Sequence, residues 1–188
     1  MSLPRGHRGI SRAIALAVVF GCAGLTAGCF QPMYGTASVG QVPAVRSALA
    51  SVKVEEIDAP NGTPEARMGV EIRNALIFGL TGGSGELSPT HSLKINISGR
   101  RQQVIVDITT ARPDMEIYWI DATYSLTDLS TNRVVVTGRA FARASYDIPG
   151  QQQRFARDRG ERDAQNRSSV IIADQIKSRL ASYFVAGS

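Results

Sequence analysis

The chain has 188 residues, of which 43% are apolar and 20% are charged. This composition provides enough apolar material for one compact core and excludes a wholly disordered chain. The net charge is +5, but three of the basic residues are Arg5, Arg8 and Arg12. Removing them from the 21 leaves 18 basic against 16 acidic residues from Cys29 onward, a balance of +2. We therefore expect no nucleic-acid partner, because nucleic-acid-binding proteins usually carry a strongly basic surface.

The N-terminus combines a basic segment, residues 1–12, with an uncharged run of sixteen residues, 13–28. This run is shorter than the roughly 20 apolar residues that span a bilayer as a helix, and its end is rich in small residues, as in a cleaved export signal. We predict that residues 1–28 are a signal peptide. The residues LTAG directly before Cys29 resemble a bacterial lipobox, with threonine where leucine is commonest.

Cleavage at this point would make Cys29 the first residue and the site of lipid attachment. More than one acyl chain gives lasting membrane anchoring, whereas a single chain gives only marginal binding. Three alternatives stay open. Cys29 could form a disulfide with Cys22, Cys22 could itself be the modified residue, or Cys29 could be a nucleophile. The last needs a base, and His7 and His91 are the only histidines.

The segment after the anchor predicts a tether, because residues 36–50 are rich in Gly, Ser, Ala and Val without a regular period. Residues 51–57 favour a short strand. A helix follows, with Thr63 as N-cap, Pro64 at the first position and Gly82 beyond the last apolar residue. Its core-facing stripe comprises Met68, Ile72, Ala75, Leu76, Gly79 and Leu80.

Three strand candidates come next. Residues 93–97 and 104–108 alternate with opposite parity, which predicts a bulge or kink after Gly99. Residues 116–128 and 133–148 each alternate cleanly and are joined by a short turn. We expect the even-numbered side chains of these two strands to form the core: Tyr118, Ile120, Ala122, Tyr124, Leu126, Val134, Val136, Ala140, Ala142 and Ala144.

A final helix is predicted from residue 151 to 184, with Ile172, Ile176 and Leu180 at helical spacing. The element order is then β-α-β-β-β-α. Segregated helices and strands predict an α+β fold, a two-layer sandwich of two helices on a mainly antiparallel four-stranded sheet. We place a single α+β domain at residues 51–188 and the lipidated N-terminus and tether at 29–50.

No motif for catalysis is present: the sequence has no GxSxG, no glycine-rich phosphate loop after a strand and no His/Cys cluster. We expect His91 in a surface loop. The sequence therefore predicts no enzymatic activity, no metal site and no cofactor, with a lipid-tethered periplasmic enzyme kept as an alternative.

Arginine placement is the strongest candidate signal for a contact surface. Arg139 and Arg143 occupy odd positions of the last strand, and Arg100 and Arg101 lie at the predicted kink. Guanidinium groups suit phosphate oxygens in bidentate geometry. We predict that these four residues contact lipopolysaccharide or a protein partner. The alternative is a solvated face with local acidic partners such as Asp121.

The stretch CFQPMYG, residues 29–35, resembles the start of the lipopolysaccharide-assembly lipoproteins of the outer membrane, the LptE family. Alphaproteobacterial members begin with a Cys-Gly-Phe-x-Pro-Leu-Tyr-Gly-like motif; here one Gly is missing and Met33 replaces Leu. Residues 122–147 resemble the family's hairpin, and residues 162–184 resemble its final helix.

This resemblance implies a lipid-anchored protein on the periplasmic face of the outer membrane. The implied partners are the LptD-type β-barrel that translocates lipopolysaccharide, in whose lumen family members sit as a plug, and lipopolysaccharide itself. The resemblance carries over no ligand residue. The alternative is an auxiliary lipoprotein of an ABC-type lipid transport system, which would have the same leader and a similar domain.

Overall fold

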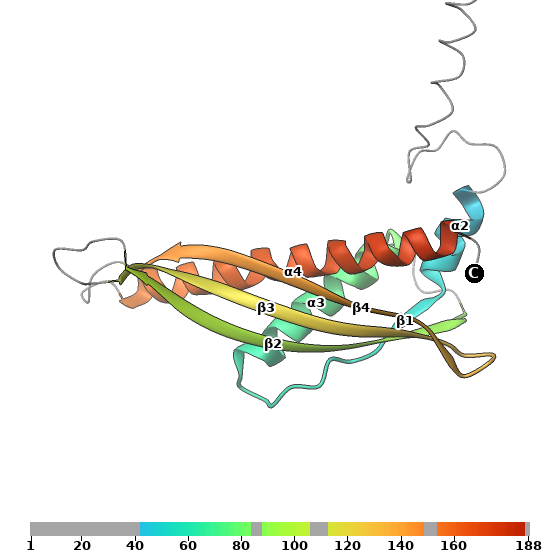
Figure 1. Cartoon of the computed structure of the whole chain (residues 1–188), viewed down its shortest axis with the longest axis horizontal. Helices are drawn as coiled ribbons and strands as arrows, with labels where there is room; N and C mark the ends of the chain where they lie inside the picture. The colour runs from blue at the N-terminus through green and yellow to red at the C-terminus, as the bar shows by residue number, and fades with distance from the viewer. Residues whose placement is uncertain (1–41, 84–87, 106–112, 149–153, 187–188) are drawn as a thin grey trace, which may run out of the picture. The chain divides into compact units, whose positions relative to one another are not determined.

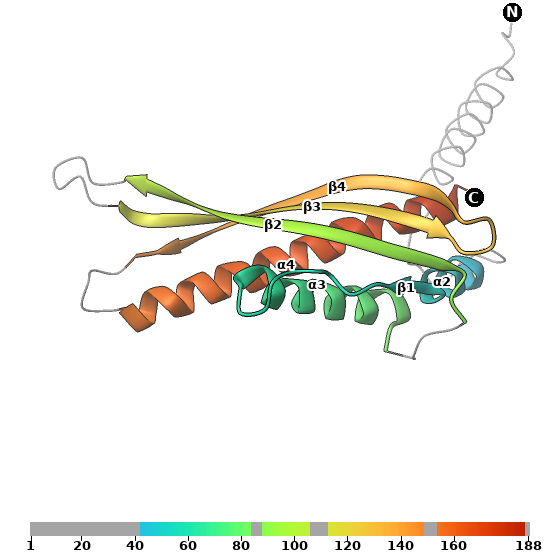
Figure 2. The same ribbon diagram turned by 90° about the horizontal axis from the view of Figure 1, so that it is seen from below.

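The computed structural model describes residues 42–83, 88–105, 113–148 and 154–186. Residues Pro43–Ser188 form one compact unit, in which a sheet carries helices on one face (Figures 1 and 2). The elements in chain order are α2 (Val42–Ala50), β1 (Val52–Val54), α3 (Pro64–Thr81), β2 (His91–Ile105), β3 (Pro113–Asp128), β4 (Arg133–Asp147) and α4 (Arg154–Val185). The predicted α+β fold and its β-α-β-β-β-α order are confirmed, with α2 as an additional helix.

The four strands lie in the order β1-β2-β3-β4. β1 pairs in parallel with the first residues of β2, from Val52 opposite His91 to Val54 opposite Leu93. The other two pairings are antiparallel and much longer. The short β1 and the long β4 are therefore the outermost strands.

Helix α3 begins and ends where the sequence predicts. The Thr63 hydroxyl accepts a hydrogen bond from the backbone N–H of Ala66 at 3.2 Å, which satisfies one of the free donors of the first turn. At the other end Gly82 has φ 64° and donates its N–H to the Phe78 carbonyl at 2.9 Å, the left-handed cap that glycine adopts without strain. Four residues of the predicted stripe are buried: Met68, Ile72, Leu76 and Leu80.

Helix α4 packs on α3, β3 and β4. Ile172, Ile176 and Leu180 are fully buried, as their spacing predicts. Small residues line the contact between the helix and the sheet, which lets the two layers approach closely. They are Ala140, Ala142 and Ala144 on the strand and Ala164, Ser168, Ser169 and Ala173 on the helix, all buried.

The predicted change of parity after Gly99 is wrong. The register of β2 against β3 runs without interruption from His91 to Val104, and the only shift lies between Val104 and Ile105. Arg101 therefore keeps the phase of Leu93 and lies on the helix-covered side of the sheet. The predicted strand residues 106–108 lie outside the described residues.

Val134 was expected in the core but is 58% exposed. The register of β3 against β4 shifts here, because Leu126 pairs with Val136 whereas the next residue, Thr127, pairs with Val134. The skipped residue, Val135, is half-buried against the core. This β-bulge reverses the phase of the strand before Val136.

Two further expectations differ from the structure. The predicted tether extends to Ala50, whereas helix α2 begins at Val42 and buries Leu49 and Ala50. His91 is the first residue of β2 and not a loop residue, and its ring makes an edge-to-face contact with Phe184 at 5.2 Å.

Candidate functional site

The two faces of the sheet differ in what covers them. Helices α3 and α4 lie on one face, and no described element lies on the other (Figures 1 and 2). We call the uncovered side the open face. Strand alternation and register define its side chains, which include Lys94, Asn96, Ser98, Arg100, Gln102, Ile117, Trp119, Asp121, Thr123, Ser125, Thr137, Arg139, Phe141, Arg143, Ser145 and Asp147.

A tryptophan lies between two of the predicted arginines on this face. Trp119 pairs across the sheet with Arg100 on one side and Arg143 on the other. Their guanidinium carbons lie 4.9 Å and 4.7 Å from the centre of the indole ring, within the range of cation–π attraction. The indole Nε1 is buried and has no hydrogen-bond partner among the described residues. The ring thus restrains two guanidinium groups whose N–H donors can still bind an anion.

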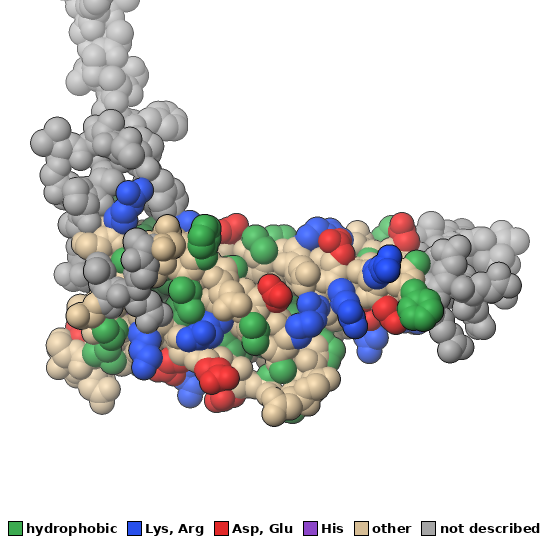
Figure 3. Space-filling view, turned by 180° about the vertical axis from the view of Figure 1, so that it is seen from behind, with side chains coloured by type: hydrophobic (Ala, Val, Ile, Leu, Met, Phe, Trp, Pro, Cys, Tyr) green, Lys and Arg blue, Asp and Glu red, His purple; other side chains and the backbone are tan. Residues whose placement is uncertain are grey.

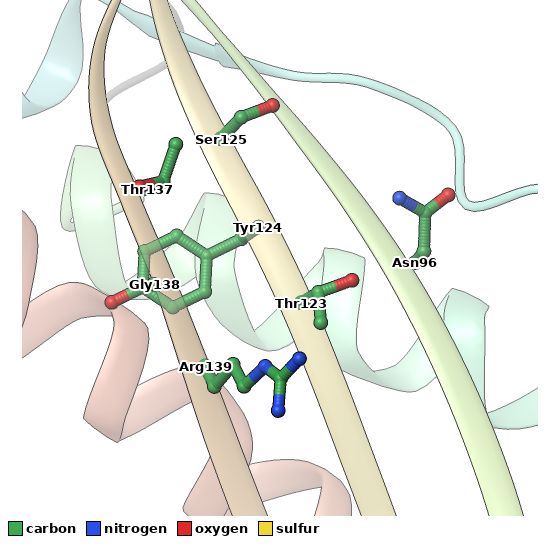
Figure 4. A pocket seen from close by; sticks show the side chains of 7 residues that line it. All are labelled: Asn96, Thr123, Tyr124, Ser125, Thr137, Gly138 and Arg139. Carbon is green, nitrogen blue, oxygen red and sulfur yellow. The ribbon is translucent and has the colours of Figure 1, made fainter.

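Arg139 lies further along the same face, opposite Thr123. Its side chain reaches from β4 toward Thr123 on β3 (Figure 4). Here the surface forms a depression of about 420 Å³, lined by Asn96, Thr123, Tyr124, Ser125, Thr137, Gly138 and Arg139. Gly138 leaves room for the Tyr124 ring, since a Cβ at this position would lie 2.4 Å from the tyrosine oxygen.

The open face carries an excess of positive charge. Its cations are Lys94, Arg100, Arg139 and Arg143, and its acids are Asp121 and, at the end of β4, Asp147. None of the three ion pairs between described residues involves any of these six side chains. The proposed local pairing with Asp121 is therefore absent within the described structure. On the helix-covered side of the molecule, by contrast, basic and acidic side chains are interspersed (Figure 3).

The structure brings together three of the four predicted contact arginines: Arg100, Arg139 and Arg143. Arg101 lies on the opposite side of the sheet, where its Nη1 is 3.4 Å from the Glu161 carboxylate of α4. This separation corrects the expectation of one surface formed by all four, and its cause is the unbroken alternation of β2.

Trp119 and Lys94 were not among the predicted site residues. Alternation placed Trp119 on the same side as the odd-numbered residues of the following strand. The signal that could have identified it is the hairpin register, which sets Trp119 opposite Arg143. Lys94 could have been identified by extending one unbroken alternation along β2, which places its side chain on the same face as that of Arg100.

A second polar cluster lies on the helix-covered side, around Glu116, which is 2% exposed. Its carboxylate accepts hydrogen bonds from Gln103 Nε2 at 3.1 Å, Arg157 Nη2 at 2.9 Å and the Tyr146 hydroxyl. Burial raises the pKa of Glu116, but these hydrogen bonds outweigh it and hold the pKa below its ordinary value. Burial, followed by the bond to Glu116, raises the pKa of Tyr146. The cluster joins three strands to α4 and needs no ligand to be satisfied.

Within the described residues, no group of three or more His, Cys, Asp or Glu side chains could hold a metal ion. No helix in that part of the chain is both long and apolar enough to cross a membrane. Cys29 and the predicted leader lie outside the described residues.

Comparison of the sequence with family models and with curated proteins gives no match. Solved structures do share the fold. A protein from Caulobacter crescentus CB15 described as a lipoprotein superposes with a TM-score of 0.62 at 20% identity, covering 77% of this chain and 98% of its own. A minor lipoprotein from Acinetobacter baumannii gives 0.52 at 15% identity, covering 72% and 93%. Rare lipoprotein B from Shewanella oneidensis gives 0.50 at 12% identity, covering 72% and 96%. The chain therefore has the fold of these lipoproteins.

Proposed function

We propose that this chain is an outer-membrane lipoprotein, anchored through Cys29 on the periplasmic face, that assists lipopolysaccharide assembly. It would do so by plugging and supporting an LptD-type β-barrel translocon, as a binding protein without enzymatic activity. The fold shared with lipoproteins and the resemblance of residues 29–35 to the LptE family support this role. The observation that carries the proposal is the basic open face on that fold.

The chemistry of the open face suits an anionic surface. Arg100 and Arg143 are restrained by Trp119, so less side-chain entropy is lost when they bind. The two candidate surfaces are acidic side chains lining the barrel and the phosphates of lipid A. Desolvated contacts of this kind contribute to binding far more than exposed ion pairs contribute to folding.

Lipid attachment is tested by Cys29→Ser. We expect the variant to accumulate as an unprocessed precursor of about the full calculated mass, because the lipidated cysteine defines the cleavage site. Intact-protein mass spectrometry measures both cleavage and acyl mass. The lipid anchor would be contradicted if the wild type and the variant were cleaved alike and neither carried the mass of an acyl group.

The role of the open face is tested by replacing Arg100, Arg139 and Arg143 with Gln together. We expect an unchanged melting curve, reduced co-purification with the barrel and weaker lipopolysaccharide binding, with both losses largest at low salt. Arg133→Gln is the matched control, since this arginine lies at the beginning of β4, away from the other three. Recovery of an inner-membrane ATPase system in place of the barrel would favour the lipid-transport alternative and overturn the proposal.

A further inference from the structure

The two edge regions of the sheet differ in whether other parts of the chain form hydrogen bonds with their outward backbone groups. Along β4, side chains of α4 bind the outward backbone groups. Gln175 Oε1 accepts the Phe141 N–H at 3.2 Å, and its Nε2 donates to the Phe141 carbonyl at 3.0 Å. Arg167 Nη2 donates to the Ser145 carbonyl at 3.0 Å. The helix thus occupies backbone groups on which another strand would have to pair.

The β2 edge lacks such cover over most of its length. β1 pairs only as far as Leu93, whose carbonyl accepts the Glu55 N–H at 3.0 Å. That bond shows that the backbone groups of Leu93 point away from β3. Since backbone direction alternates along a regular strand, the odd-numbered residues that follow point the same way. No hydrogen bond from a described residue reaches the outward N–H and C=O groups of Ile95, Ile97, Gly99, Arg101 or Gln103.

We propose that the β2 edge, residues 95–103, accepts an added β-strand from a partner protein that carries acidic side chains on both of its faces. Unpaired N–H and C=O groups on a sheet edge are the recognition elements of strand addition. Lys94 and Arg100 lie on the open face beside this edge, and Arg101, with 55% of its side chain exposed, lies on the helix-covered side. The consecutive arginines therefore place one guanidinium on each side of the position that the added strand would occupy, Arg100 in none of the ion pairs between described residues and Arg101 3.4 Å from Glu161.

A second copy of this chain fits the edge poorly. β2 carries Lys94, Arg100 and Arg101 and no acidic residue, so in any register a second copy would bring three more cations and no counter-charge to this edge. With a two-fold axis at Ile97, Arg100 or Arg101, cations of the two copies would lie directly opposite each other. Like charges in directly opposed positions destabilise a strand pair, so an acidic segment of a different protein is the better occupant.

The test uses full-length protein purified from membranes and a synthetic peptide, Thr-Val-Thr-Glu-Glu-Thr-Val-Thr, whose adjacent glutamates point to opposite faces. Amide hydrogen exchange is followed residue by residue. We expect exchange at the outward N–H groups of Ile97, Gly99, Arg101 and Gln103 to slow at least tenfold when peptide is added. The N–H groups of β2 that pair with β3 should not change.

Two matched peptides and three variants define the outcome. A peptide N-methylated at every residue cannot pair and should give no protection, and a peptide with lysine for glutamate should give much less. Arg100→Gln and Arg101→Gln should each weaken binding several-fold, and Arg133→Gln, at the opposite end of the sheet, should leave it unchanged. The proposal is overturned if exchange does not respond to millimolar peptide, if the methylated peptide protects equally, or if these N–H groups are already protected in the free protein.

Discussion

The interior between sheet and helices has two halves of opposite character. Where both α3 and α4 cover the strands, the side chains are apolar and buried, including Leu93, Leu126 and Ile176. We call this the proximal half. The strands and α4 continue beyond the first turn of α3 (Figure 2), and in this distal half Glu116 and Arg157 occupy the corresponding space.

The two halves differ because α4 alone buries less apolar surface of the sheet than α3 and α4 bury together. In α4 none of residues 155–163 is buried, and the first buried position is Ala164. A single helix over a long hairpin leaves too little apolar area to hold its end by burial alone. Hydrogen bonds and ion pairs around Glu116 and Glu161 hold it instead. We therefore expect the two halves to respond differently to mutation, acid and salt.

Leu126→Ala should have the largest effect, because it creates a cavity in the proximal half, where the side chain is fully buried. Truncation of a buried leucine costs about 2 to 5 kcal/mol of unfolding free energy. Urea denaturation at neutral pH measures this loss. A loss no greater than that of the polar substitutions below would mean that the apolar half is not the main source of stability.

Glu116→Gln should cost about 1 to 3 kcal/mol, the range for disturbing buried hydrogen bonds to a charged group. The pKa of Glu116 is below its ordinary value of 4.5 in the folded chain. Its contribution is therefore complete above about pH 4.5 and is lost as the pH falls through the folded value. The unfolding free energy of the variant should therefore fall less steeply than that of the wild type as the pH is lowered through this range. Parallel acid denaturation curves for variant and wild type would contradict a distal half held by this carboxylate.

Val136→Ala and Val134→Ala together test where along β4 the buried side chains of the proximal half end. Val136 is 7% exposed, and loss of its two methyl groups should cost about 1.6 kcal/mol at about 0.8 kcal/mol each. Val134 is 58% exposed, and its substitution should change stability by less than about 0.5 kcal/mol. Thermal melts of the pair provide the comparison, and equal losses would place the β-bulge elsewhere.

Arg101→Gln should have the smallest effect, about 0.5 kcal/mol or less. Its side chain is 55% exposed and its distance to Glu161 is 3.4 Å, the geometry of an exposed ion pair with little net value. Denaturation in low and high salt tests this. A loss above about 1 kcal/mol, abolished by salt, would show that the distal half depends on this pair as well.

Local chemistry made much of the fold predictable. Thr63, Pro64 and Gly82 each have conformational preferences that act within one turn, so the bounds of α3 follow from them. Regular alternation from Tyr118 to Leu126 gave the buried row of β3 correctly. These features depend on near neighbours in the chain.

The remaining features depend on partners that are distant in the sequence. The bulge beside Val134 and the side of the sheet on which Arg101 lies are set by strand register, which alternation alone does not fix. Glu116 shares the parity of the predicted core row, yet its burial is tolerated only because Gln103 and Arg157 meet it there. Helix α2 has no marked periodic stripe, so its docking through Leu49 depends on tertiary contacts.

The position of α4 in the chain has a consequence for folding order. This helix is the last element, yet Ile172, Ile176 and Leu180 form much of the inner wall opposite the sheet. Contacts that join the end of the chain to α3 and β3 close long loops and slow the search for the native state. Until α4 docks, the part of the inner face that β3 and β4 form is bare, because α3 packs on β1 and β2. The chain is at its most vulnerable to aggregation and proteolysis in that interval.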